Sequence, residues 1–191
     1  PIADALEAAA ARALDKQGWG PARERDSTWT GLAIDGALLV MTDGRTAAQT
    51  AADLGARDVA VFDRPLVLPS SPGTALAFAV ALLASASWRS QAPAWLAALG
   101  FAPLPLADAP GLVVARTIAM LINEAADAVQ QGVCNQAGAD AAMKLGVNYP
   151  AGPFEWLATW SARDVVALLD ALDHHYRGER YRASPFLRQQ A

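Results

Sequence analysis

The pattern of apolar residues changes near residue 107, and this change constrains the fold more than any other feature of the chain. Before it, short apolar runs alternate with segments of helical spacing. The expected strands are residues 38–42, 59–62, 75–81 and 102–106, and the expected helices are 1–18, 44–55 and 90–100. Strands that alternate with helices predict a mostly parallel sheet covered by helices.

After residue 107 the apolar residues recur only at helical spacing. Glycines and capping residues mark the expected helix ends, namely Gly132, Asn135, Gly146 and Ser161 followed by Asp164. The apolar faces carry Val114, Ile118, Ile122, Ala125 and Val129 on one helix, and Val165, Leu168, Leu169, Leu172 and Tyr176 on another. We therefore expect an α/β region at residues 1–109 and an all-α domain at residues 110–191.

The stretch MKLGVNYPAGPFEWL joins two of these helices. Pro150 and Pro153 restrict the backbone between them, and Phe154 and Trp156 are expected to anchor the next turn in the core. The pattern predicts a rigid connector between helices. Such a connector either only shapes the fold or also lines a ligand cleft.

Composition and charge exclude several classes of protein. The net charge is −4 and the basic residues are scattered, so a nucleic-acid-binding stripe is not expected. The longest apolar run, residues 74–88, is shorter than the roughly 20 residues that a bilayer requires. The single cysteine, Cys134, cannot form an internal disulfide, and we expect a cytoplasmic protein. Because the chain opens on Pro1, we expect it to be part of a longer protein.

Four motifs in order carry a resemblance to a known family: DAPGLVVAR, NEAADAVQQGV, DAAMKLGVNYPAGPFEW and ERYRASPFLR. Over about the last 80 residues the sequence resembles the C-terminal domain of 3-hydroxyacyl-CoA dehydrogenases. The segment WLAALGFAPLPLADAPG is similar, more faintly, to the end of that family's dinucleotide-binding domain. The resemblance implies a degenerate Rossmann-like α/β region followed by the helical domain of this family.

The residues that carry the family's chemistry are absent. A dinucleotide site needs a glycine-rich turn after the first strand, whereas here the turn is DGRT. The family's acid–base pair is a histidine held by a glutamate, but His174 and His175 both lie in the helical region. Ala115 stands where the family has a substrate-contacting asparagine. We therefore expect no catalytic, cofactor-binding or metal-ligating residue in this chain.

The resemblance implies a non-catalytic C-terminal half of an NAD-dependent 3-hydroxyacyl-CoA dehydrogenase of fatty acid β-oxidation type. The parent would bind NAD and oxidise a 3-hydroxyacyl-CoA to the 3-oxoacyl-CoA, and this fragment alone would be inactive. Its expected partners are the N-terminal catalytic half, which it would support as a pseudo-dimer partner, and further copies in a homo-oligomer. The motifs AMKLGVNYP and HHYRGERYR resemble the phenylacetate-degradation enzymes that act on 3-hydroxyadipyl-CoA. The substrate-proximal candidates are Tyr149, Pro153, Phe154 and Glu155.

Two alternative functions and two further sequence features are weighed against this interpretation. The chain could be a free-standing acyl-CoA-binding or protein-interaction module without catalysis. A hydrolase using Ser70 or Ser71 is disfavoured because the G-x-S-x-G pattern is absent. His174 and His175 are adjacent, so they point to different faces of a helix and cannot chelate one metal as an i, i+4 pair would. The run RGERYR is either a solvated helix exit or a contact for a CoA phosphate.

Overall fold

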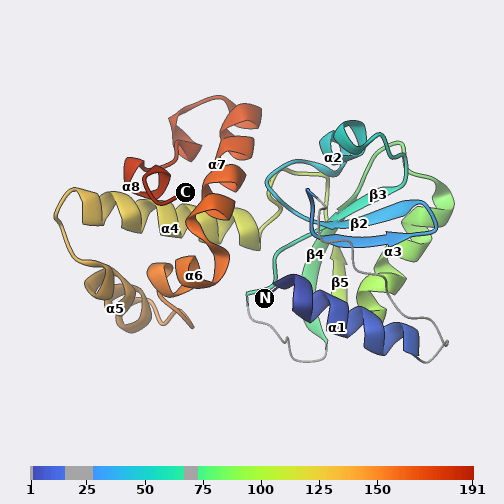
Figure 1. Cartoon of the computed structure of the whole chain (residues 1–191), viewed down its shortest axis with the longest axis horizontal. Coiled ribbons are helices and arrows are strands. Elements are labelled where there is room, and N and C mark those ends of the chain that lie inside the picture. The colour runs from blue at the N-terminus through green and yellow to red at the C-terminus, as the bar shows by residue number, and fades with distance from the viewer. Residues whose placement is uncertain (1, 16–27, 67–72) are drawn as a thin grey trace. The chain divides into compact units, whose positions relative to one another are not determined.

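The computed structural model describes residues 2–15, 28–66 and 73–191 (Figure 1). It divides into two compact units, Pro1–Val114 and Ala115–Ala191. The first contains α1 (Ile2–Asp15), β1 (Gly31–Ile34), β2 (Ala37–Met41), α2 (Ala47–Leu54), β3 (Val59–Phe62), β4 (Thr74–Val80), α3 (Ala86–Ala98) and β5 (Phe101–Pro105). The remaining elements are α4 (Val114–Gln130), α5 (Gln136–Gly146), α6 (Pro153–Trp160), α7 (Ala162–Tyr176), the 3-10 helix η1 (Glu179–Tyr181) and α8 (Pro185–Arg188).

The sheet of the first unit is mixed, and its strands follow the order β1-β2-β3-β4-β5. β2 pairs with β3, and β4 with β5, in parallel, whereas the β1–β2 and β3–β4 pairs are antiparallel. The prediction of a mostly parallel sheet is therefore wrong. Only residues 63–73 lie between β3 and β4, and a parallel connection needs a crossover of about a dozen residues or more, usually a helix. The strand consequently reverses.

Strand β1 was not predicted, and it forms a hairpin with β2. Asp35 and Gly36 make the two-residue turn, with φ angles of 49° and 84°. Two positive φ angles define the primed turn that matches the right-handed twist of paired strands, and Asp-Gly is a preferred sequence for it. The dipeptide was a usable hairpin signal. β1 was missed because it is only four residues long and mostly half-buried, so it shows no alternation.

The core of the first unit is one continuous apolar cluster that runs from Leu6 in α1 to Leu112 and contains both aliphatic and aromatic side chains. All four residues of β3 are buried, and α2 and α3 pack on β3 and β5 respectively. α3 begins at Ala86, earlier than predicted, because the Ser85 hydroxyl accepts a hydrogen bond from the Trp88 N–H at 3.1 Å and caps the helix. Pro93 lies inside α3.

The second unit is helical throughout its described elements, as the sequence predicts. Of the predicted apolar faces, Ile118 and Ile122 of α4 and Val165, Leu168, Leu169 and Leu172 of α7 are buried. Full burial of each such side chain stabilises the fold by about 1.5–3 kcal/mol. Val114, Ala125 and Val129 are half-buried, and Tyr176 at the end of α7 is 44% exposed, contrary to the prediction. None of the helices in the described part of the chain combines the length and apolar character needed to span a bilayer.

Candidate functional site

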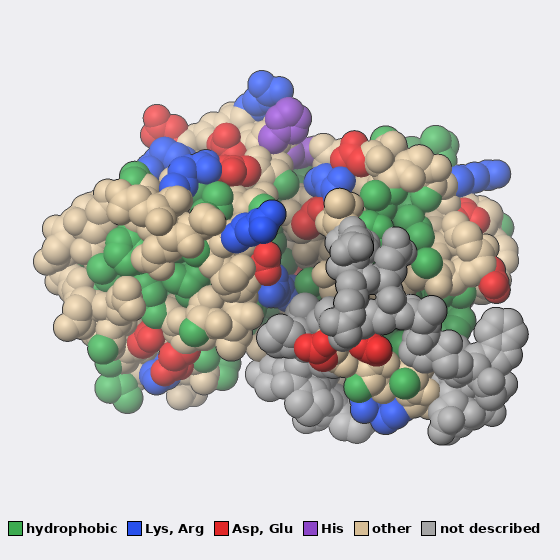
Figure 2. Space-filling view, in the orientation of Figure 1, with side chains coloured by type: hydrophobic (Ala, Val, Ile, Leu, Met, Phe, Trp, Pro, Cys, Tyr) green, Lys and Arg blue, Asp and Glu red, His purple; other side chains and the backbone are tan. Residues whose placement is uncertain are grey.

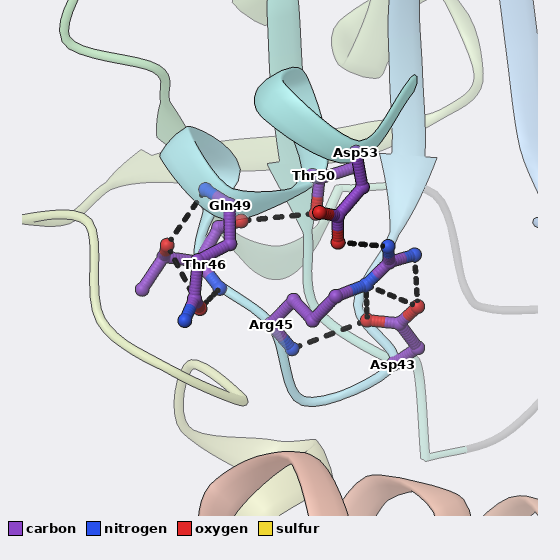
Figure 3. A network of polar contacts seen from close by, with 6 residues as sticks. All are labelled: Asp43, Arg45, Thr46, Gln49, Thr50 and Asp53. Carbon is purple, nitrogen blue, oxygen red and sulfur yellow. Dashed lines mark hydrogen bonds and ion pairs between the residues drawn. The ribbon is translucent and has the colours of Figure 1, made fainter. Parts of the chain in front are cut away.

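The turn between β2 and α2 is where a dinucleotide-binding fold would place its glycine-rich loop, and here it is filled by side chains (Figure 3). Arg45 Nε lies 3.1 and 3.0 Å from the two carboxylate oxygens of Asp43, and Arg45 Nη1 lies 2.7 Å from Asp53. The hydrogen bonds to Asp43, with a further contribution from Asp53, raise the pKa of Arg45. The guanidinium of Arg45 thus forms ion pairs with two carboxylates of its own chain, those of Asp43 and Asp53.

The backbone N–H groups at the start of α2 are all paired within the first unit. Thr46 and Gln49 form a reciprocal capping box: the Gln49 N–H donates to Thr46 Oγ1 at 3.0 Å, and the Thr46 N–H donates to Gln49 Oε1 at 2.9 Å. The Ala47 and Ala48 N–H groups donate to the two carboxylate oxygens of Asp108, at 2.7 and 2.9 Å.

Asp108 therefore holds the position that an anionic ligand would take at this helix terminus. A pyrophosphate could bind there only by displacing that carboxylate. The residues of the β2–α2 turn do not fit a dinucleotide. In the sequence Asp108 stands out only as the first residue of the motif DAPGLVVAR, and nothing near it indicates that it caps a helix 60 and 61 residues away.

A second carboxylate, that of Asp63, caps the start of α4, which is 50 and 51 residues away in the sequence. It follows β3 and is 0% exposed. Its Oδ2 accepts hydrogen bonds from the Val113 and Val114 N–H groups, at 2.9 and 2.7 Å, and its Oδ1 accepts one from the Arg64 N–H at 2.8 Å. The first residue of α4 is thereby fastened to the end of a sheet strand. Sequence reasoning missed Asp63 altogether.

The four substrate-proximal candidates lie within the stretch MKLGVNYPAGPFEWL, Tyr149 between α5 and α6 and the other three in the first turn of α6, but they differ in exposure. Pro153 and Phe154 are buried, and the Phe154 ring lies edge-on to Phe186 with centroids 6.2 Å apart. Tyr149 and Glu155 are exposed, and the Tyr149 ring lies 6.0 Å from that of Trp156. Only Tyr149 and Glu155 thus present side chains that a ligand could contact.

Glu155 is tied to the helix before the connector. Its carboxylate forms an ion pair with Lys144 and accepts the Gly152 N–H at 2.9 Å. The hydrogen bond from Lys144, followed by that from Gly152, lowers the pKa of Glu155. Gly152 itself has no room for a side chain, since an added Cβ would lie 2.3 Å from Asp140 Oδ1. The contacts of the connector are those of a rigid joint between two helices.

The remaining candidates do not form a site in the structure. His174 and His175 lie in the last turn of α7, and Figure 2 shows the histidine side chains on the surface beside a basic side chain. Within residues 2–15, 28–66 and 73–191, no group of three or more His, Cys, Asp or Glu is arranged to hold a metal ion. Ser70 and Ser71 lie outside the described residues.

Comparison with known families decides what kind of chain this is. Residues 111–191 match the family model described as 3-hydroxyacyl-CoA dehydrogenase, C-terminal domain, and residues 39–110 match the 3-hydroxybutyryl-CoA dehydrogenase reduced Rossmann-fold domain. The chain belongs to the 3-hydroxyacyl-CoA dehydrogenase family. The predicted order of a Rossmann-like region followed by the family's helical domain is confirmed.

Two family members from Escherichia coli match over most of this chain but over about a third of their own length. 3-Hydroxyadipyl-CoA dehydrogenase of Escherichia coli (strain K12) is 42% identical over 83% of this chain and 32% of its own. A crystal structure of 3-hydroxybutyryl-CoA dehydrogenase from Escherichia coli K12 substr. MG1655 superposes with a TM-score of 0.79 at 38% identity, covering 90% of this chain and 35% of that one. PaaH1 of Ralstonia eutropha, at 22% identity and a TM-score of 0.66, shows the shared fold. The chain thus spans about a third of the length of the E. coli relatives.

Proposed function

We propose that this chain is the non-catalytic C-terminal part of an NAD-dependent 3-hydroxyacyl-CoA dehydrogenase. The observation that carries the proposal is the start of α2, where Thr46 and Asp108 use the N–H groups that a dinucleotide phosphate would need. The parent reaction is the oxidation of a 3-hydroxyacyl-CoA to the 3-oxoacyl-CoA. NAD and the acid–base pair would belong to the portion of the polypeptide outside this chain.

The lack of a histidine in the first unit also supports the proposal that catalysis belongs to the polypeptide outside this chain. The whole chain has two histidines, and both lie in α7. The first unit therefore has no imidazole that could accept a hydroxyl proton near neutral pH. A fold kept without its catalytic groups is best explained by a role in assembly.

The assembly role that we propose is that of a pseudo-dimer partner for the helical domain of the catalytic half. Three large apolar side chains near α5 are strongly exposed: Val133 is 74%, Leu145 87% and Val147 57% exposed. Large apolar side chains left exposed on a helical domain are candidates for contact with another protein surface. In the isolated chain this surface would favour self-association, and in the parent it would pair with the catalytic half and support a homo-oligomer.

The substrate subclass is part of the proposal. The 42% identity to a 3-hydroxyadipyl-CoA dehydrogenase supports that substrate for the parent, and with it a place in phenylacetate catabolism in the cytoplasm. Tyr149 and Glu155, the two exposed candidates of the connector, are proposed to lie near the acyl-CoA bound by the catalytic half.

The test is NADH formation from 3-hydroxyadipyl-CoA or 3-hydroxybutyryl-CoA, measured by absorbance on the 191-residue chain and on the longer polypeptide that contains it. We expect activity in the longer protein only. Turnover by the 191-residue chain alone would overturn the assignment of a non-catalytic role. Tight binding of a CoA ester to an inactive longer protein would instead favour the acyl-CoA-binding module.

A further inference from the structure

The turn between β4 and α3 presents two leucines to solvent. Leu82 is 79% and Leu83 78% exposed, whereas Ala81 and Ala84 on either side are buried. Among the described residues of the first unit, these are the two most exposed large apolar side chains. We call residues 81–84 the leucine turn.

The leucine turn is held rigidly by two arginines. Arg89 Nη2 donates to the Ala81 and Leu82 carbonyl oxygens at 3.1 and 2.5 Å, and Arg57 Nε donates to the Leu83 carbonyl oxygen at 3.0 Å. Because the backbone is already fixed, docking of a partner on the two leucines would lose little further conformational freedom. Two exposed leucines on a rigid turn are therefore well suited to contact with another protein surface.

A groove of about 250 Å³ adjoins the leucine turn at the ends of β4 and β5, which Figure 1 shows side by side. It is lined by Phe78, Ala79, Val80, Arg89, Pro105 and Leu106. Arg89 thus belongs both to the wall of the groove and to the support of the turn. The groove has a mainly apolar lining, and it is linked to the two leucines through Arg89 and through Val80, which directly precedes the turn.

The edge of the sheet beside this groove is unsuited to pairing with another strand. The Leu106 N–H donates to the Phe78 carbonyl oxygen at 2.8 Å, so alternate residues of β5 face β4. Pro103 and Pro105 occupy the other positions, whose N–H would point outward, and proline has none. A partner would therefore contact this surface through side chains rather than by adding a strand.

We propose that the leucine turn and its groove dock the part of the longer dehydrogenase polypeptide that lies outside this chain; this inference rests on the proposed function. Arg89 forms no ion pair with any described residue, whereas Arg57 interacts with the carboxylate of Asp58, so the partner surface would be apolar with a carboxylate placed to meet Arg89. A covalently linked partner is present at about millimolar effective concentration, and a small surface then suffices. A second copy in solution would need to bury about 1,200 Å² or more in total, which two leucines and one groove do not offer.

The experiment measures thiol labelling at the leucine turn. Leu82→Cys is introduced with Cys134→Ser into both the 191-residue chain and the longer polypeptide, and the rate of reaction with a maleimide is compared. Ala52→Cys, at an exposed position of α2, serves as the matched control. We expect Leu82→Cys to react at least ten-fold more slowly in the longer protein, and Ala52→Cys to react equally in both.

Every other result overturns the inference. Equal rapid labelling at Leu82→Cys in both proteins would show that nothing covers the leucine turn. Slow labelling in the 191-residue chain that becomes fast on dilution would identify a second copy as the occupant. Dehydrogenase assays on the same longer protein separate the two proposals: protection without activity would refute the proposed function, and activity without protection would refute only the docking surface.

Discussion

Replacing Asp63 by alanine tests the view that buried carboxylates organise the first unit. The side chain is 0% exposed and accepts three backbone N–H groups, those of Arg64, Val113 and Val114. A hydrogen bond to a charged group contributes about 1.5–3 kcal/mol. Three such bonds are lost in Asp63→Ala, and the loss is partly offset because the variant no longer buries a carboxylate, so we expect the free energy of unfolding to fall by about 4 kcal/mol.

Urea denaturation followed by circular dichroism measures this loss. With a denaturant slope of about 2 kcal/mol per molar, a change of this size moves the midpoint by about 2 M. Asp63→Asn is the matched control, because it keeps the shape and one acceptor oxygen and should lose about half as much. A loss below about 1 kcal/mol for Asp63→Ala, or an equal loss for both variants, would refute the reasoning.

Three further predictions concern Asp108, Gly152 and the ion pair between Lys144 and Glu155. Asp108→Ala should destabilise the chain by about 2 kcal/mol in urea melts, with a smaller loss in high salt, because a charged cap at the start of α2 disappears; a stability equal to wild type would contradict this. Gly152→Ala should cost about 1–3 kcal/mol in thermal melts, since its Cβ would meet Asp140, and an unchanged midpoint would show that the connector can yield. The pKa of Glu155 is lowered in the fold, so its contribution to stability is present at neutral pH and is lost as the pH falls through the folded pKa. Lys144→Met should therefore raise the pKa of Glu155 in an NMR titration, and no change would refute the ion pair.

Local sequence signals predicted the helical unit well because its determinants are local. Apolar residues three and four positions apart mark the buried faces of α4 and α7, and the central positions of both faces are buried in the structure, whereas Tyr176 at the end of α7 is exposed. The Ser161 hydroxyl accepts the Asp164 N–H at 3.2 Å, as the capping pattern predicts. Asn135 likewise caps α5 through the Gly138 N–H at 2.8 Å.

The first unit was predicted less well because its determinants are distant in the chain. Asp63 and Asp108 meet helix starts 50 and 61 residues away, and nothing in their immediate neighbours indicates these contacts. The direction of β4 depends on the length of a connection rather than on the composition of a strand. By contrast, the Asp35–Gly36 hairpin carried a readable signal and was overlooked.

The cap that Asp108 provides also affects the order in which this chain can fold during synthesis. An eight-residue helix such as α2 is unstable in isolation, since isolated helices shorter than about 12 residues are marginal in water. The N–H groups of Ala47 and Ala48 have no carboxylate to bind until Asp108, about 60 residues further along the chain, has left the ribosome. We therefore expect the first unit to settle only when translation has passed residue 108, so that a ribosome stalled earlier would display α2 as a protease-sensitive segment.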